Sequence, residues 1–485
     1  MNITDPIGRN ARLAPLAPAI LHYGELLTYS QLNAVVDSIA LRLITLGLAP
    51  GQAAGVMLTH GHAQLAFTLA LARIGVTAVV SRDAVRGTGG LALSATFADG
   101  ATGAEASGAT VVDESWWRAP TAPVAARSRS VPSHPDGSAT CLVVTSSGTT
   151  GVPKAIALSH DMLRARQYAK WLAFRAPDVP RQICSLGMES YYGFSTALRT
   201  LWMGGLAVTG IRWDDIPVAI PFHQLNSLVV SPTQLGRMLE SFPPGSGPFP
   251  GLQVVEVGGS ALPSRLAAAA RAQLCGNVQV AYGAAELGFV ASMGSGLLEG
   301  RPGAVGYVAP GVEVQAVGTE DQPLAASTEG LLRIRSATCV DAYVGDPAAS
   351  ARAFRRGWFY PGDVGAIADD GLISVAGRSG EMINAGGVKV SPRDIEDVVL
   401  RNPNVGEAAA FAMPNPATGL EEAWVAVVQK QAVDLQVLHR YCLNELGVRA
   451  PRSIMIVGSL PRNERGKLLV DELVRLARAA KKTAP

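Results

Sequence analysis

The sequence contains Leu142-Val-Val-Thr-Ser146-Ser147-Gly148-Thr149-Thr150-Gly151-Val-Pro153-Lys154, an apolar run followed by a loop of hydroxyls and glycines that ends in a lysine. Glycines allow backbone N–H groups to close around an anion, hydroxyls add donors, and the ammonium group adds positive charge. This pattern predicts a strand that leads into a cradle for a polyphosphate. A glycine- and threonine-rich surface loop is the other interpretation that the spacing alone leaves open.

The common P-loop is excluded. Its pattern requires glycine where Pro153 stands and a hydroxyl where Ala155 stands.

Short apolar runs recur along the chain and alternate with helix-like stretches, which predicts α/β layers with mostly parallel strands. These runs cover residues 139–144, 206–211, 225–230, 254–257 and 278–281. Near the start of the chain, Thr28-x-x-Gln31 is a capping box, and it predicts an amphipathic helix over 30–46 that Gly47 closes.

From residue 305 the pattern changes to alternating strands separated by Gly/Pro turns, which predicts an antiparallel sheet or a distorted β-barrel. The expected strands cover 312–317, 330–334, 365–367 and 372–375. After Gly377-Arg-Ser-Gly380 a new helix is expected, with Ser391 as its cap, Pro392 first and Asp394 third. We therefore predict a large N-terminal domain of mixed sheets and helices over 1–378. A small, mobile α+β domain is expected over 379–485.

Composition and charge exclude several classes of protein. Of 485 residues, 48% are hydrophobic and 16% charged, and the net charge is only +2 with both signs mixed. Nucleic-acid binding is disfavoured, because it needs a basic surface. The most apolar stretch, 65–80, is interrupted by Thr68, Arg73 and Thr77, so no membrane span is expected. The first residues do not resemble a signal peptide, and we expect a cytoplasmic protein. Five scattered cysteines without a Cys-x-x-Cys pair are expected to be buried thiols.

The sequence resembles the adenylate-forming superfamily of acyl-CoA synthetases, nonribosomal-peptide adenylation domains and luciferases, and within it most closely the acyl- or aryl-CoA ligases. The hallmark of that superfamily is the loop Ser-Gly-Thr-Thr-Gly-x-Pro-Lys. Its other motifs follow here in order as Gly258-Gly-Ser260, Tyr282-Gly-Ala-Ala-Glu286, Gly357-Trp-Phe-Tyr-Pro-Gly-Asp363, Gly377-Arg378, Gly386-Gly-Val-Lys-Val390 and Pro461-Arg-Asn-Glu-Arg-Gly-Lys467. The resemblance therefore covers nearly the whole chain.

The resemblance implies that the protein uses ATP and Mg²⁺. The residues implied to hold the ATP phosphates are Ser146, Ser147, Gly148, Thr150, Gly151 and Lys154. The residues implied at the adenine and the ribose are Gly258, Gly259, Ser260, Tyr282, Gly283, Asp363 and Arg378. The implied catalytic residues are Thr149, Glu286, which would help to hold Mg²⁺ beside the phosphates, and Lys467, which would reach the substrate carboxylate and the α-phosphate.

Each of these residues also has an ordinary interpretation when it is taken alone. Asp363 fits a turn, Tyr282 fits a core aromatic, and lysines in Gly-Lys pairs are usually solvated. Two positions depart from the family, which usually has threonine where Ala285 and Pro361 stand. A lower rate or a weaker affinity for ATP is expected from them. The family's hinge position is occupied by Gly380, whose backbone freedom permits domain rotation.

An acyl pocket is implied at Tyr191, Tyr192, Phe194 and Ser195. Amino-acid-activating relatives have an aspartate at the position of Tyr191, so an α-amino acid is disfavoured. Aromatic residues suit an aryl or medium-chain acyl acid, although core packing explains some of them equally well. Glu189 lies two residues before Tyr191 and could supply a charge.

The segment 383–396 resembles the CoA-ligase version of its motif, and Gly386 and Gly387 would line a tunnel for the thiol. The resemblance thus implies an acid:CoA ligase, which joins a carboxylic acid to CoA through an acyl-AMP. One alternative is a stand-alone enzyme that loads the acid onto the phosphopantetheine of a separate carrier protein. An alternative of another class is a non-catalytic protein that binds a nucleotide or an acyl-adenylate. A homodimer is left open.

Overall fold

The computed structural model describes residues 1–80, 90–100, 108–118, 131–146, 153–174, 177–243, 245–301, 303–385, 388–415, 420–462 and 468–483. The chain divides into two compact units. Unit 1 comprises Met1–Val314 and Arg333–Pro361, and unit 2 comprises Gln315–Leu332 and Gly362–Pro485. The domain boundary expected after residue 378 stays a prediction.

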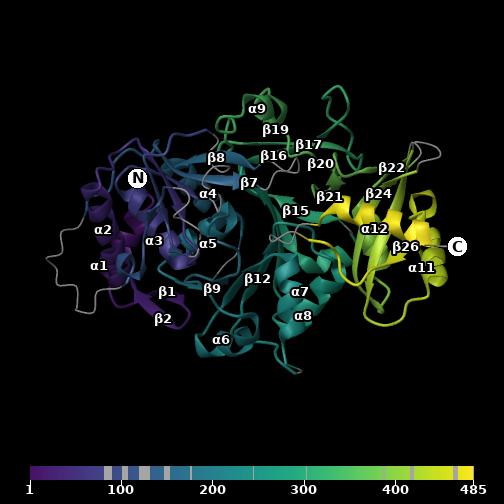
Figure 1. Cartoon of the computed structure of the whole chain (residues 1–485), viewed down its shortest axis with the longest axis horizontal. Coiled ribbons are helices and arrows are strands. Elements are labelled where there is room, and N and C mark those ends of the chain that lie inside the picture. Colours follow the sequence, from purple (N-terminus) through teal and green to yellow (C-terminus); the bar gives the residue numbers. More distant parts are fainter. Residues whose placement is uncertain are drawn as a thin grey trace. The chain divides into compact units, whose positions relative to one another are not determined.

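The first sheet of unit 1 contains both ends of the segment 142–154, in its last two strands, β7 and β8 (Figure 1). Its strands, in spatial order, are β6 (Thr110–Val111), β5 (Ala95–Ala98), β3 (Ala53–Met57), β4 (Thr77–Val80), β7 (Thr140–Ser146) and β8 (Lys154–Ser159). All neighbouring pairs are parallel except the last, because β7 and β8 form an antiparallel hairpin.

A second sheet forms the rest of the α/β core of unit 1. Its strands, in spatial order, are β15 (Ala304–Val308), β14 (Gly288–Gly294), β13 (Val278–Ala284), β12 (Val254–Gly258), β11 (Ser227–Val230), β9 (Arg181–Cys184), β10 (Leu206–Thr209), β1 (Pro18–His22) and β2 (Glu25–Thr28). The strands from β13 to β1 are parallel, and the pairs at both ends are antiparallel. The predicted mixed α/β fold with mostly parallel strands is confirmed.

Helices follow most of these strands, because two parallel strands need a crossover connection, which is usually a helix. They are α1 (Asp5–Leu13), α2 (Tyr29–Thr45), α3 (Gly61–Arg73), α4 (His160–Ala173), α5 (Tyr191–Trp202), α6 (Ile216–Phe222), α7 (Pro232–Ser241) and α8 (Ser264–Gln273). The expected helix over 30–46 is α2. Both bonds of its capping box are present, with Thr28 Oγ1 accepting from the N–H of Gln31 at 3.3 Å. Gly47, with φ +87°, closes it in the left-handed region that glycine tolerates.

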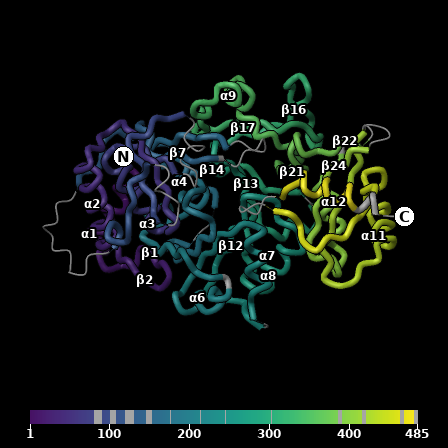
Figure 2. The backbone as a smooth tube through the Cα atoms, viewed as in Figure 1, coloured from purple at the N-terminus to yellow at the C-terminus, as the bar shows by residue number. Residues whose placement is uncertain are grey.

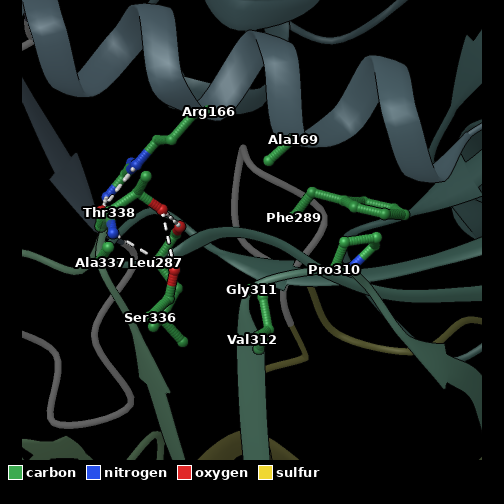
Figure 3. A pocket seen from close by; sticks show the side chains of 10 residues that line it. All are labelled: Arg166, Ala169, Leu287, Phe289, Pro310, Gly311, Val312, Ser336, Ala337 and Thr338. Carbon is green, nitrogen blue, oxygen red and sulfur yellow. Dashed lines mark hydrogen bonds between the residues drawn. The ribbon is translucent and has the colours of Figure 1, made fainter.

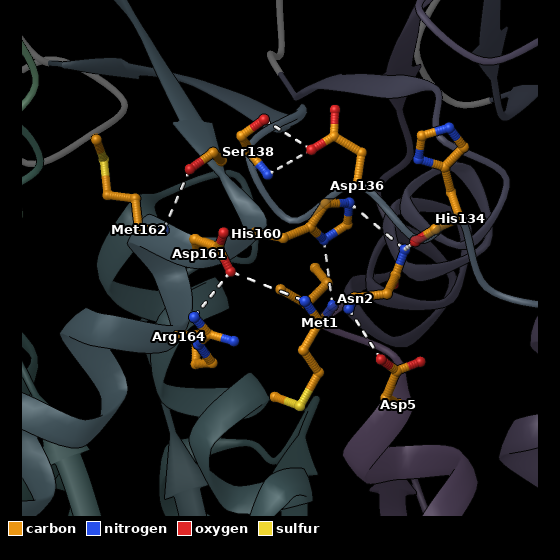
Figure 4. Close-up of polar contacts among 12 residues, drawn as sticks. Met1, Asn2, Asp5, His134, Asp136, Ser138, His160, Asp161, Met162 and Arg164 are labelled. Atoms are coloured by element: carbon orange, nitrogen blue, oxygen red, sulfur yellow. Dashed lines mark hydrogen bonds and ion pairs between the residues drawn. The ribbon is translucent and has the colours of Figure 1, made fainter.

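The first residues of the chain contact helices α3 and α4, and Figure 4 shows Met1 and Asn2 beside His160 and Asp161 at the start of α4. Asn2 donates to the carbonyl of Ala72 at 2.8 Å, and the backbone N–H of Ile3 donates to Nδ1 of His160 at 3.1 Å. His160 is fully buried, and burial lowers the pKa of its imidazole to about 4. The ring is therefore neutral at physiological pH and can accept that bond.

The region after residue 305 is built from antiparallel pairs, as predicted. Its elements are β16 (Val312–Val317), β17 (Gly330–Ser336), α9 (Pro347–Ala353), β18 (Phe354–Arg355), β19 (Trp358–Phe359), β20 (Asp363–Ile367) and β21 (Ile373–Arg378). Within unit 1, β19 pairs with β17 and β18, and within unit 2, β20 pairs with β17 and β21. A closed barrel stays a prediction.

The remainder of unit 2 is a sheet covered on both faces (Figure 2). Its elements are β22 (Ile383–Ala385), β23 (Val388–Val390), α10 (Pro392–Val399), β24 (Val405–Pro414), β25 (Glu421–Gln429), α11 (Leu435–Leu446), β26 (Ser453–Ile456) and α12 (Val470–Thr483). Alternate residues of β25 face opposite sides: Val425 packs with α10 and α11, and Trp424 packs with Leu473 and Ala477 of α12. This is the predicted small α+β domain architecture.

Ser391 occupies the N-cap position and the helix begins at Pro392, both as predicted, but the Ser391 side chain does not make the expected capping bond. The hydroxyl of Ser391 donates to the carbonyl of Ala376 and makes no bond to the first turn of α10. Arg393 reaches the same strand, because its Nη1 donates to the carbonyl of Val375 at 3.0 Å. The Ser391 side chain, which the local sequence predicts to cap α10, instead anchors this helix to β21.

Among the described residues, no helix is both long and apolar enough to cross a membrane. The five cysteines are all free thiols. Cys141, Cys184 and Cys442 are buried, while Cys275 and Cys339 are half-buried.

Glu396 on α10 gives unit 2 a pH-dependent stability. Burial raises the pKa of its carboxyl to about 7, although the N–H of Ala410 donates to its Oε1 at 2.9 Å. A raised folded-state pKa means that stability is fully present below the unfolded value of about 4.5 and is lost as the pH rises through 7. We expect Glu396→Gln to stabilise the protein by about 1 to 3 kcal/mol at pH 8 and to change little at pH 4.

Thermal or chemical unfolding at the two pH values measures this effect. Glu472→Gln, at a half-exposed surface carboxylate, is the matched control and should change stability little at either pH. Equal stabilisation by Glu396→Gln at pH 4 and pH 8 would show that the carboxyl is not titrating as stated.

Candidate active site

The β7–β8 hairpin places both ends of the predicted phosphate loop. Ser146 at the end of β7 lies opposite Lys154 at the start of β8. The connecting residues, which include Ser147, Gly148, Thr149, Thr150 and Gly151, lie outside the described part of the chain. Their roles, like those of all the site residues named from the sequence, remain predictions.

Tyr343 connects the hairpin with the motif glutamate. Its hydroxyl donates to Oε1 of Glu286 at 2.8 Å, and the ammonium of Lys154 lies 4.8 Å from the centre of its ring. The N–H of Val344 donates to the carbonyl of Ala155 at 2.9 Å, which fixes Tyr343 beside β8. One tyrosine thus orients a carboxylate through a hydrogen bond and holds a cation over its face. The sequence did not indicate Tyr343, because only the fold brings residues 155 and 344 together.

Arg166 on α4 holds the turn that carries Glu286. Its guanidinium donates to the carbonyls of Ala285 at 2.8 Å and Glu286 at 2.6 Å, and to the carbonyl of Thr338 at 2.8 and 3.1 Å. Arg166 is 3% exposed, and it stacks on the ring of Tyr191 at 5.0 Å. Three carbonyls would lose charged donors without it, so Arg166 positions this turn.

A cavity of about 120 Å³ borders the guanidinium of Arg166 (Figure 3). Its lining residues are Arg166, Ala169, Leu287, Phe289, Pro310, Gly311, Val312, Ser336, Ala337 and Thr338. None of the site residues predicted from the sequence lines it. The cavity therefore lies beside the element that supports Glu286 and not in the predicted nucleotide site.

The motif glutamate fits a magnesium ion that arrives with ATP. Glu286 is 7% exposed, and within the described part of the chain only Tyr343 donates to its carboxylate, through Oε1. Its Oε2 is thus available to a cation. No group of three His, Cys, Asp or Glu side chains among the described residues could hold a metal ion by itself. Magnesium commonly binds through one or two carboxylates together with substrate phosphates, and this arrangement suits it.

The glycines at the end of β12 are explained by close approach and by backbone conformation. A Cβ at Gly258 would lie 2.8 Å from the hydroxyl of Tyr192 and 2.9 Å from the carbonyl of Ala281. Gly259 has φ +90°, which favours glycine.

The neighbouring motif residues Ser260, Tyr282 and Gly283 differ in exposure and in structural role. Ser260 is exposed, and Tyr282 is half-buried on β13 opposite Ala291. A Cβ at Gly283 would lie 2.3 Å from the carbonyl of Gly288, so this glycine lets the β13–β14 hairpin close.

Helix α5 carries the predicted acyl-pocket residues. Ser190 caps it by accepting from the N–H of Gly193 at 3.0 Å. Tyr191 lies against Arg166, whereas Ser195 Oγ accepts from Gln167 at 3.0 Å. Phe194 is 1% exposed, which matches the core packing that the sequence left open for these aromatics.

Tyr192 belongs to a buried ionic cluster that the sequence did not indicate. Oε1 of Glu256 accepts from the hydroxyl of Tyr192 at 2.5 Å and from the ammonium of Lys170. Arg199 Nη2 lies 3.5 Å from Oε2 of the same carboxylate. Glu256 and Lys170 are 1% and 7% exposed.

The ionisation of this cluster follows from its surroundings. Burial, followed by the charge of Arg199, lowers the pKa of Lys170 to about 8. Burial opposes ionisation of Glu256, but Lys170 and Arg199 outweigh it and hold the pKa of the carboxyl below its usual value. Burial raises the pKa of Tyr192 well above its usual value, so its hydroxyl keeps its proton.

In unit 2, the predicted ribose-binding residue and its neighbour are brought together. Asp363 and Arg378 lie opposite each other on β20 and β21, with Nε 3.4 Å from Oδ1. Gly380 is exposed, and a Cβ there would meet no atom within 4 Å. Gly386, Gly387 and Lys467 lie outside the described residues.

Comparison with known proteins supports the resemblance over most of the chain. The sequence profile of the AMP-binding enzyme family matches residues 7–88 and 92–344, and that of the AMP-binding enzyme C-terminal domain matches 394–467. A salicylyl-CoA synthase / salicylate adenylyltransferase of Streptomyces sp is 28% identical over 499 residues, or 91% of this chain and 87% of that protein.

Two further similar proteins have names that describe other acceptors than CoA. A fatty acid–[acyl-carrier-protein] ligase, MmaC of Mycobacterium marinum, is 27% identical over 69% of this chain and 68% of its own length. The solved structure of the amide bond synthetase McbA from Marinactinospora thermotolerans superposes with a TM-score of 0.83 at 24% identity, covering 97% of this chain and 99% of that one. The similarity to the McbA structure establishes the fold of this chain.

The Tyr343 hydroxyl provides a test of the site. We expect Tyr343→Phe to weaken the affinity for Mg·ATP about tenfold, because a hydrogen bond to a charged group contributes about 1.5 to 3 kcal/mol. Tyr343→Ala should weaken it further, since the ring over Lys154 is also lost. Isothermal titration calorimetry without acid measures this directly. Tyr307→Phe, at an exposed tyrosine on β15, is the control, and equal affinities for all these variants would remove Tyr343 from the site.

Proposed function

Because the chain belongs to the AMP-binding enzyme family, we propose that it activates an aryl or medium-chain carboxylic acid as an acyl-adenylate and passes the acyl group to the thiol of CoA. In the first step, a carboxylate oxygen attacks the α-phosphorus of ATP, and the bond to pyrophosphate breaks. In the second step, the sulfur attacks the acyl carbon, the thiol proton leaves, and the bond to AMP breaks. Magnesium supplies charge neutralisation at the phosphates.

The residues of this chain perform three tasks in the proposed reaction. Lys154 and Glu286, joined by Tyr343, would bind the phosphates and their cation. Asp363, held by Arg378, would accept hydrogen bonds from the ribose hydroxyls. Lys467 would neutralise the charge that builds up as the carboxylate attacks phosphorus. Removal of water from the closed site would protect the mixed anhydride.

The observation that carries the choice of an aryl acid is the pair of tyrosines that begins α5. Their rings are held by buried cations, Tyr191 by Arg166 at 5.0 Å and Tyr192 by Lys170 at 5.1 Å. Rings fixed in this way offer flat surfaces to an aromatic substrate. The relative that aligns with 91% of this chain is named for salicylate, an aryl acid, which supports the same choice.

An α-amino acid fits this site poorly. Tyr191 stands where a carboxylate would be needed to pair with an ammonium. Glu256 lies nearby, but two cations and a hydroxyl already engage its carboxylate. An unpaired substrate ammonium would therefore lose its hydration without compensation.

The second candidate acceptor is the phosphopantetheine of a separate carrier protein. Its support is the similarity to a fatty acid–[acyl-carrier-protein] ligase over 69% of this chain. CoA is preferred because the segment 383–396 follows the CoA-ligase version of its motif. A non-catalytic nucleotide-binding protein is disfavoured because the chain has Lys467, whose proposed role serves the attack on phosphorus and not the binding of the nucleotide.

Pyrophosphate release over a panel of acids tests the proposal. We expect benzoates, cinnamates or C4 to C10 fatty acids to be activated, because a hydrophobic acyl group pays no desolvation penalty in this pocket. The twenty proteinogenic amino acids form the comparison set, and a best substrate among them would overturn the choice of acid. Thioester formation is then measured with free CoA and with a phosphopantetheinylated carrier protein, and the faster acceptor decides between the two.

Lys467→Ala separates the two half-reactions. We expect it to abolish acyl-AMP formation and to leave thioester formation from preformed acyl-AMP largely intact. A preorganised cation at the developing charge is worth a few kcal/mol, or about 100-fold or more in rate. Lys430→Ala, at an exposed lysine of unit 2, is the control. Retention of more than about a tenth of the wild-type pyrophosphate exchange would show that Lys467 lacks this role.

A further inference from the structure

A buried polar cluster lies between three elements of unit 1. It comprises Lys170 on α4, Glu256 on β12, and Tyr192 and Arg199 on α5. Lys170 and Arg199 are 7% and 5% exposed, and Glu256 is 1% exposed. The carboxylate of Glu256 is the shared acceptor, with Lys170 and Tyr192 on Oε1 and Arg199 near Oε2.

The charges in this cluster do not balance. Two cations share one carboxylate, and no second carboxylate among the described residues is paired with Lys170 or Arg199. Tyr192 supplies no negative charge, because its hydroxyl keeps its proton. Burying an uncompensated charge is costly, and a cluster with a purely structural purpose avoids it. One additional anionic or acceptor group would compensate the excess positive charge.

Two members of α5 have unused hydrogen-bonding capacity. Within the described part of the chain, the guanidinium of Arg199 makes one side-chain hydrogen bond, at 3.5 Å to Glu256, although it has five N–H donors. Thr196 is 2% exposed, and its buried hydroxyl has no hydrogen-bond partner among the residues that the structure describes. Thr196 lies four residues after Tyr192 and three before Arg199, so all three share one face of the helix. An unpartnered buried hydroxyl therefore sits on the face that carries the excess positive charge.

The cluster adjoins the predicted acyl pocket. Glu256 lies two residues before Gly258 on β12, so both face the same side of the sheet. The hydroxyl of Tyr192 comes within 2.8 Å of the place where a Cβ on Gly258 would be. Ligands in such folds bind beyond the carboxyl ends of parallel strands, and β12 ends at Gly258. A substrate in the acyl pocket could thus reach the cluster with its far end.

We propose that the acid substrate carries a second oxygen acceptor, a hydroxyl or a carboxylate, which is bound by Arg199 and Thr196 beside the Lys170–Glu256 pair. This inference rests on the proposed function and specifies its substrate class. The acceptor gives the guanidinium and the Thr196 hydroxyl their missing partners. An ionised acceptor also balances the charge of the cluster. An unsubstituted hydrocarbon acid provides neither.

Matched acids test the proposal through kcat/KM for pyrophosphate release. The panel contains benzoate, the three hydroxybenzoates and the three benzenedicarboxylates, with straight-chain C6 and C8 monoacids and diacids as the aliphatic pairs. We expect the best substituted acid to exceed its unsubstituted partner at least tenfold. Arg199→Met should reduce this ratio to below threefold. Arg164→Met, at a surface arginine of α4, is the control and should leave the ratio unchanged.

Thr196→Val keeps the proposal testable if Arg199→Met does not fold. Valine has the shape of threonine without the hydroxyl, and a hydroxyl without a partner contributes no stability. We expect Thr196→Val to fold and to reduce the ratio at least threefold. A structural role for the cluster would change the thermal midpoint of these variants and leave the ratio as it is in the wild type.

The outcomes separate this inference from the proposed function. Activation of benzoate or a straight-chain monoacid as efficiently as its substituted partners overturns the second acceptor and leaves the acid ligase standing. An unchanged ratio in folded Arg199→Met or Thr196→Val also overturns it. Failure to release pyrophosphate with every acid of both sets overturns the proposed substrate class and this inference together.

Discussion

The arrangement of the candidate site depends on the hydrogen bonds of one buried guanidinium. Arg166 is held by backbone carbonyls, and through them it fixes the turn between β13 and β14 that presents Glu286. Because carbonyl dipoles stabilise the guanidinium charge, Arg166 does not need to pair with the carboxylate of Glu286. Tyr343 then sets the direction of that carboxylate, and Lys154 lies on the other side of the tyrosine ring. Helix α4, the motif turn and the β7–β8 hairpin are thereby joined.

Helix α4 shows why much of this site could not be predicted from the sequence. Its inward face carries Arg166, Gln167 and Lys170 at the spacing of a core face, but with polar residues. Patterns of hydrophobicity assign such residues to the surface. Their partners, Glu286, Ser195 and Glu256, are distant in the sequence and come together only in the fold. A sequence with 16% charged residues thus places several of them inside.

Local structure was predicted correctly from the sequence where one short-range interaction determines where an element begins. The capping box at Thr28 and Gln31 is satisfied within four residues, and it begins α2 as expected. The parallel strands followed from apolar runs with turn residues between them. The role of Ser391 was not predictable in this way, because its hydroxyl chooses between the helix end and Ala376, fifteen positions away. The phosphate cradle was predicted from the residues of the loop, and the role of Lys467 from the family resemblance; residues 147–152 and Lys467 lie outside the described part of the chain.

The discontinuity of unit 2 has a consequence for how the chain is made. Unit 2 combines Gln315–Leu332 with Gly362–Pro485, while the intervening Arg333–Pro361 belongs to unit 1. During synthesis, which proceeds from the N-terminus, the first part of unit 2 leaves the ribosome before the strand that pairs with it at Gly330 has been translated. The two α/β sheets of unit 1 lie within Met1–Val314 and can assemble from residues that are already available. Unit 2 must wait for its later segment and then close a loop over the intervening residues. A nascent chain that stalls before β20 is translated would therefore expose the edge of β17 with which β20 pairs in the folded protein.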